Sequence, residues 1–172
     1  MNVDFEKTKP FIIEVANFSD IEEKIPEFIE KAIKEPVRKT TLYWEYKLIG
    51  GYTEYAEITY DPLEEKLKIE VRFASQYGIE PKDIIDIKNE ALSETVSFLG
   101  YKIYAEGNID FNYATDEYFS WGEAVCEISI GKEKLRNFAG TLRKIIRKVT
   151  ELADEMTEKA FEELVIPYYG EE

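Results

Sequence analysis

Histidine is absent from this chain of 172 residues, and cysteine occurs only once. Without histidine, one chain cannot build a Ser-His-Asp triad, a histidine-ligated zinc site or a histidine general base. Cys126 can form no internal disulfide, which favours a reducing compartment, and its apolar neighbours predict a buried, structural thiol. These absences favour a cytoplasmic protein that is not an enzyme and holds no metal or other cofactor.

Other familiar patterns are missing too. No apolar run approaches the roughly 18 residues of a membrane span, and the charged residues 1–10 do not resemble a signal segment. No Walker loop and no G-x-G-x-x-G stretch is present, which disfavours the common nucleotide enzymes. The 22 basic and 36 acidic residues give a net charge of −14, so phosphate backbones would be repelled. We expect no membrane and no nucleic-acid partner.

The remaining composition suits one folded unit. Apolar residues make up 44% of the chain, and no repeat, low-complexity tract or Gly/Ser linker interrupts it. Glu and Lys are abundant whereas Gln occurs once, a balance that leans towards a thermophilic source. We expect a single acidic domain over residues 1–172.

Alternating apolar and polar side chains predict the strands. They lie over residues 42–48, 52–60, 67–73, 103–111 and 124–130. Gly50-Gly51 predicts a hairpin turn after the first of them, since both central positions of a type I′ turn need positive φ. Residues 114–116 are expected to form the turn of the last hairpin, between the strands over residues 103–111 and 124–130. A short apolar run, Phe11–Val15, is compatible with an edge strand.

Capping and breaking residues predict the helices. A Ser-x-x-Glu capping box at Ser19 opens the first helix, and Pro81 with Gly100 frames a second one over residues 81–99. Apolar spacings of three and four predict a last helix of about 30 residues, over 132–165. The predicted fold is α+β: an antiparallel sheet of about five strands, helix order α-βββ-α-ββ-α and a long C-terminal helix.

The last predicted helix separates its charges, with basic residues in its first half and acidic residues in its second. This order opposes the helix dipole, but it suits two copies packed antiparallel. The apolar seam that would form this dimer consists of Leu135, Phe138, Leu142, Ile145, Val149, Leu152 and Met156. Packing of the same seam on the protein's own sheet is the alternative, because an amphipathic stripe does not identify its partner.

Aromatic residues crowd the two predicted hairpins. We expect those on one face to form core and those on the other to form a half-wet surface for a protein or peptide partner. The candidate partner-binding residues are Tyr43, Trp44, Tyr46, Tyr52, Tyr55, Tyr118 and Trp121. The alternative is that the protein's own helices or N-terminal segment cover the second face.

Acidic side chains around residue 110 raise the question of a metal site. Asn108, Asp110, Asn112 and Asp116 superficially resemble a calcium loop. However, Tyr113 stands where such a loop needs glycine, and Phe119 stands where it needs a bidentate glutamate. We interpret these side chains as the polar face of a strand and expect no metal.

The element order, small size and acidity over about residues 19–165 resemble the type III secretion chaperone-like fold, including its YbjN-type cytoplasmic relatives. That resemblance implies a homodimeric protein that holds an extended or partly unfolded polypeptide on exposed sheet surface. We therefore expect a non-enzymatic, chaperone-like adaptor that binds a polypeptide through the aromatic hairpins. Two alternatives stay open: a domain that binds a small apolar ligand in an enclosed aromatic pocket, and a structural subunit of a larger assembly.

Overall fold

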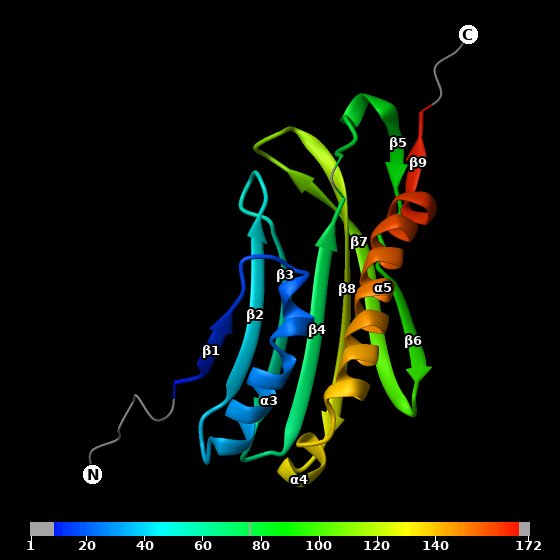
Figure 1. The fold of residues 1–172 in the computed structure, drawn as a ribbon. Coiled ribbons are helices and arrows are strands. Elements are labelled where there is room, and N and C mark those ends of the chain that lie inside the picture. Colours follow the sequence, from blue (N-terminus) through cyan, green and yellow to red (C-terminus); the bar gives the residue numbers. More distant parts are fainter. Residues whose placement is uncertain (1–8, 76, 169–172) are drawn as a thin grey trace, which may run out of the picture.

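A computed structural model describes residues 9–75 and 77–168 of the chain. It is an α+β fold in which one large twisted sheet carries helices on a single face (Figure 1). The strands of this sheet are β1 (Phe11–Glu14), β2 (Thr40–Lys47), β3 (Thr53–Asp61), β4 (Lys66–Ala74), β6 (Leu92–Phe98), β7 (Tyr101–Asn112) and β8 (Glu117–Ser129). Their order across the sheet is β1-β2-β3-β4-β8-β7-β6.

Smaller elements complete the described chain. The α-helices are α2 (Asp20–Glu23), α3 (Ile25–Lys34), α4 (Lys132–Leu135) and α5 (Ala139–Leu164). A 3-10 helix, η1 (Pro81–Asp83), leads into β5 (Ile84–Ile87), which pairs with β9 (Val165–Pro167) in a separate two-stranded sheet.

The predicted five-stranded antiparallel sheet is wrong in strand number and in direction. The main sheet has seven strands and is mixed, because β1 runs parallel to β2 whereas the other neighbours are antiparallel. The predicted strand over residues 11–15 is this edge strand, which pairs from Phe11 opposite Thr40 to Glu14 opposite Tyr43. A parallel neighbour needs a crossover, and α2 and α3 supply it.

The predicted helix over residues 81–99 does not form. This stretch contains η1, β5 and β6 instead. Pro81 does begin a helix, but a 3-10 helix of only three residues. Leu99 and Gly100 have φ of 52° and 84°, so they form the tight turn between β6 and β7. The glycine that suggested a helix end is therefore a hairpin glycine, and the order α-βββ-α-ββ-α fails at its middle helix.

The other predicted helices form with breaks. The predicted C-terminal helix is divided into α4 and α5, and α5 covers 26 residues. The first helix is divided into α2 and α3, with a proline at the start of α3, where a missing N–H does no harm. The first predicted hairpin is confirmed, since Gly50 and Gly51 have φ of 92° and 84° between β2 and β3.

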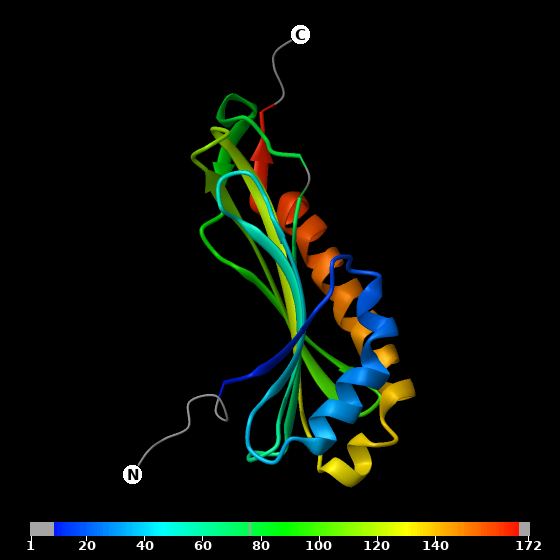
Figure 2. The ribbon, with the colours of Figure 1, turned by 60° about the vertical axis from the view of Figure 1, so that its left-hand side comes forward.

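The core lies between the sheet and the helices. Figure 2 shows α3 and α5 on the same side of the sheet; no helix of residues 9–75 and 77–168 covers its other face, here called the open face. α5 packs on β8, β7 and β4, and α3 packs on β2. Two glycines allow the closest approach: a Cβ built on Gly107 would lie 2.7 Å from the carbonyl oxygen of Met156, and Gly122 lies directly under the carbonyl of Ala153. Cys126 is fully buried in this core.

Candidate functional site: an acidic groove beside α5

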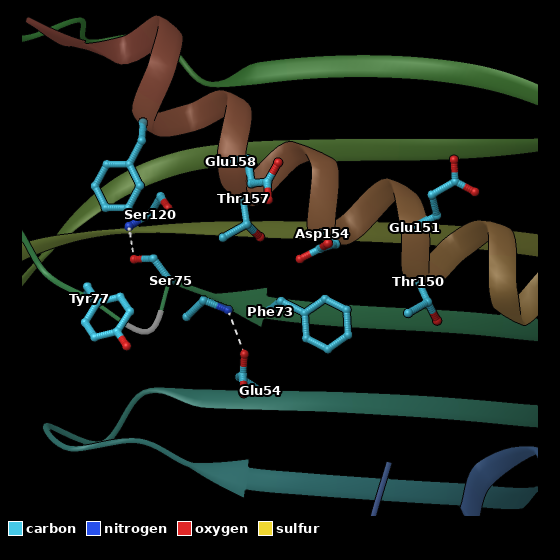
Figure 3. Close-up of a pocket in the computed structure, with 12 residues that line it drawn as sticks. Glu54, Phe73, Ser75, Tyr77, Ser120, Thr150, Glu151, Asp154, Thr157 and Glu158 are labelled. Atoms are coloured by element: carbon cyan, nitrogen blue, oxygen red, sulfur yellow. Dashed lines mark hydrogen bonds between the residues drawn. The ribbon is translucent and has the colours of Figure 1, made fainter. Parts of the chain in front are cut away.

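A groove of about 640 Å³ runs between the second half of α5 and the ends of β3, β4 and β8 (Figure 3). Its position follows from small side chains on β8. At Gly122 the helix backbone lies directly on the strand, so the longer side chains on either side form walls. Thr157, in the centre of the helical wall, donates its hydroxyl to the Ala153 carbonyl at 2.8 Å.

Carboxylates dominate the walls of this groove. Glu54 comes from β3, and Glu151, Asp154 and Glu158 come from α5; among the residues that the structure describes, no Lys, Arg or His lines the groove. The Glu54 carboxylate accepts the backbone N–H of Ala74 at 3.1 Å, and Lys148, outside the groove, lies 3.5 Å from Glu151. The remaining charge is uncompensated by the lining residues, so the groove attracts cations.

Aromatic rings stand between the carboxylates. Phe73, Tyr77 and Phe161 line the groove from three different segments. Phe18 packs edge-on against Phe73, with ring centroids 5.6 Å apart, and so supports one wall from behind. Carboxylates beside aromatic faces suit an organic cation, which gains from both the negative charge and the ring quadrupole.

A buried hydroxyl without a partner lies in the groove lining. Ser120 is fully buried, and its Oγ has no hydrogen-bond partner in the described part of the chain. Its backbone is held firmly: Ser75 N–H donates to the Ser120 carbonyl at 2.8 Å, and Ser120 N–H donates to Ser75 Oγ at 3.1 Å. An unpaired buried polar group is unfavourable and rare in stable folds, and this one lies in the groove wall without access to the open space of the groove.

The predicted partner-binding aromatics do not form one surface. Tyr43, Tyr55 and Trp121 lie on the open face, as strand alternation and pairing register place them. Trp44 faces the helices and packs on Phe18, with ring centroids 5.3 Å apart. Tyr46 and Tyr52 line a separate cavity at the ends of the hairpins, where Tyr52 contacts Phe119. Tyr118 pairs with Ile79, and its ring contacts Phe111.

The seam predicted for a dimer lies inside the chain's own core. Each of its residues is at most 8% exposed: Leu135, Phe138, Leu142, Ile145, Val149, Leu152 and Met156. The seam packs on the sheet, which is the second of the two arrangements that the sequence allowed. A second copy cannot contact these side chains unless α5 leaves the sheet.

The open face carries acidic side chains in directly paired positions. Glu57 is opposite Glu70, and Glu106 is opposite Glu123, although like charges across two strands destabilise a sheet. Burial, together with the hydrogen bond and charge of Glu70, raises the pKa of Glu123 to about 7. The pKa of Glu70 lies below the ordinary value of a glutamate. Burial acts to raise it, but the hydrogen bond from Glu123 and the charge of Lys68 outweigh burial and lower it. The pair therefore retains a shared proton to near neutral pH.

This shared proton makes stability depend on pH. Because the folded pKa of Glu123 exceeds its unfolded value, its contribution is complete below pH 4.5 and is lost as the pH rises through about 7. Glu123→Gln keeps a donor to Glu70, so we expect the variant to be more stable than the natural protein at pH 8 by about 1 kcal/mol, after allowance for solvent screening. Urea unfolding at pH 5 and pH 8 measures this.

The matched control for that prediction is Glu127→Gln. Glu127 lies on the same strand and face but is exposed. Its removal should leave the difference between pH 5 and pH 8 unchanged. An equal pH response in both variants would contradict a proton shared by Glu70 and Glu123.

Sequence reasoning missed most of the groove. The acidic residues of its helical wall were visible as a charged half-helix, but the pattern was assigned to a dimer. Glu54 and Ser120 carried no signal, because each is separated from Asp154 by at least one other element of the chain. The groove exists only where β3, β8 and α5 meet.

The Asn108 and Asp110 side chains lie in β7, as their interpretation as strand residues predicted. Within residues 9–75 and 77–168, no group of three or more His, Cys, Asp or Glu side chains is arranged to hold a metal ion. In the same part of the chain, no helix has the length and apolarity to cross a bilayer.

Fold and site together define an α+β protein with one helix-covered sheet face and an acidic, ring-lined groove. No protein-family model matches the chain. No curated protein matches it either.

Proposed function

We propose that this protein is a non-enzymatic binding protein that holds a basic segment of a polypeptide partner in the groove beside α5. The observation that carries the proposal is a groove of about 640 Å³ whose described lining has four carboxylates, three aromatic rings and no basic side chain. A volume of this order is typical of ligand sites. A lysine or arginine side chain fits such walls, because its aliphatic stem packs on rings while its head meets carboxylates.

The hydroxyl groups of the groove support binding over catalysis. Thr150 and Thr157 donate to the carbonyls of Ile146 and Ala153 on their own helix, and Ser75 accepts a backbone N–H. A nucleophilic hydroxyl needs a hydrogen bond to a general base, and the bonds described for these three go to backbone groups instead. The groove offers recognition groups and no activated nucleophile among them.

The charge of the whole chain supports a basic partner as well. At −14 the protein attracts cations from a distance, and the groove concentrates carboxylates that are not neutralised by its own lining. Long-range attraction of this kind raises association rates and weakens as salt screens it. A polypeptide with clustered Lys or Arg residues is the partner that this field selects.

The test is binding of a fluorescent basic peptide, measured by anisotropy at low and physiological salt. Asp154→Asn combined with Glu158→Gln should weaken binding about 3–10-fold, since each partly exposed ion pair contributes up to ~1 kcal/mol. The control combines Glu162→Gln with Glu163→Gln, two exposed positions of α5 that remove the same charge outside the groove. It should change affinity less than twofold at physiological salt.

Three results would reject the proposal: no binding of the basic peptide, equal binding of an acidic peptide, or equal weakening by the groove variant and its control. Binding of a free polyamine without any binding of the peptide would also reject it, because the groove would then select a small cation. Retention of the far-ultraviolet circular dichroism of both variants shows that the fold is kept.

A further inference from the structure

A second cavity of about 340 Å³ adjoins the acidic groove, and Ser75 lines both. It lies between the two hairpin ends, next to the region where β4 leaves the sheet. Its lining includes the rings of Tyr46, Tyr52 and Phe119 and the side chains of Leu48 and Ile49. Among the described residues, its lining has one basic and one acidic side chain, Lys47 and Glu117, so this charge is balanced where that of the groove is not.

The aromatic walls of this cavity are held in place by bonds between the hairpins. The Tyr52 ring lies 4.2 Å from the Phe119 ring between centroids, and the Tyr52 hydroxyl donates to the Phe111 carbonyl at 2.6 Å. Asn112 Nδ2 donates to the Ile49 carbonyl at 2.8 Å. Walls that are fixed before binding lose little conformational freedom when a ligand enters.

Tyr46 is exposed although it faces the same side of the sheet as the core. It pairs with Glu54 across β2 and β3, two residues beyond the half-buried Trp44, and it is 56% exposed. α3 packs on β2, and Figure 1 shows this helix beside the lower part of the strand, below its upper end. An exposed ring beside fixed rings is the arrangement in which an apolar side chain of a partner would be buried.

We propose that this cavity is a second subsite that takes a large apolar or aromatic side chain from the same polypeptide whose basic residue occupies the groove. This inference rests on the proposed function. The shared wall residue Ser75 carries it, because an extended chain that passes over this residue can present a basic side chain to the carboxylates and a neighbouring apolar side chain to the rings. The recognised segment therefore combines positive charge with a large apolar residue, and charge alone binds more weakly.

The experiment compares two peptides of equal charge on the full-length protein, one with a Phe next to its basic residues and one with Ser there. The natural protein should bind the Phe peptide about 5–10-fold more tightly. Tyr46→Ser should remove most of that preference and leave the affinity for the Ser peptide within twofold. Asp154→Asn should weaken both peptides alike.

Two further variants keep the test sharp. Tyr104→Ser removes a ring of similar exposure, 48%, on the open face, and should change neither affinity. Tyr46→Phe should keep the preference and shows that the ring, not the hydroxyl, is required. The second subsite is rejected if the natural protein binds the two peptides equally, or if Tyr46→Ser weakens both peptides equally. Either result leaves the proposed binding of basic residues in the groove intact. Failure of both peptides to bind overturns the proposed function and the subsite together.

Discussion

Gly122→Ala is expected to lower the free energy of unfolding by about 2–4 kcal/mol, among the largest effects of any single added methyl group in this protein. An alanine Cβ at this position would lie 2.5 Å from the backbone N and 2.6 Å from Oγ1 of Thr157, and closer still to the carbonyl oxygen of Ala153. Two of these three atoms are backbone atoms of α5, so the helix itself would have to move away from β8. Urea unfolding measures the change, and the melting temperature should fall by about 5–15 °C.

Gly140→Ala is the matched control, with the opposite expected sign. Gly140 lies inside α5, and a Cβ there would meet no atom within 4 Å. Gly140 is the second residue of α5, and replacing glycine by alanine where the backbone accepts it stabilises a protein by about 0.4–1 kcal/mol through the unfolded chain, so this variant should be slightly more stable than the natural protein. If Gly122→Ala matched it, α5 would not rest on β8, and the groove beside α5 would lose its geometric basis.

Leu142→Ala is expected to lower the free energy of unfolding by about 3 kcal/mol. Leu142 is fully buried between α5 and the sheet, and truncation of such a side chain loses its burial and leaves a cavity. Because the seam of α5 packs within one chain, the melting temperatures of the natural protein and the variant should not depend on protein concentration. Calorimetry over a hundredfold range of concentration measures both effects.

The neighbouring exposed residue Lys144 provides the control for Leu142. Lys144→Ala on the same helix should change stability by less than about 0.5 kcal/mol. A melting temperature that rises with concentration in the natural protein and not in Leu142→Ala would contradict intramolecular packing. It would indicate instead that the seam contacts a second copy.

Much of the sheet follows from local sequence. Strict alternation places β2, β3, β4 and β7 within two residues of the predicted bounds, and Gly50-Gly51 forms the expected turn. β8 begins seven residues before the predicted strand over residues 124–130. The predicted helix over residues 81–99 is wrong because proline and glycine each occur at the boundaries of more than one kind of secondary structure. Pro81 opens a 3-10 helix as readily as an α-helix, and Gly100 ends a helix or turns a hairpin equally well.

The sequence predicted the residues of the candidate site less well than it predicted the strands. The hairpin rings were expected to divide between a core face and a partner-binding face, but the pattern did not say which ring belongs to which: Trp44 faces the core and Tyr55 faces the open face. Which face of a strand is covered depends on where the helices lie, and no local pattern contains that position. The same ambiguity applied to the seam of α5, whose spacing suits a sheet and a second helix alike.

By itself, the sequence determined the apolar periods, the turns with positive φ, the absence of histidine chemistry and the strong negative charge. These properties belong to single residues or to neighbours along the chain, so they are present before folding. Only the tertiary structure decided that α5 covers β8 and that Glu54, Ser120 and Asp154 line one groove. That decision depends on contacts between segments far apart in the sequence, because a helix can approach a strand closely only where both surfaces have matching shape.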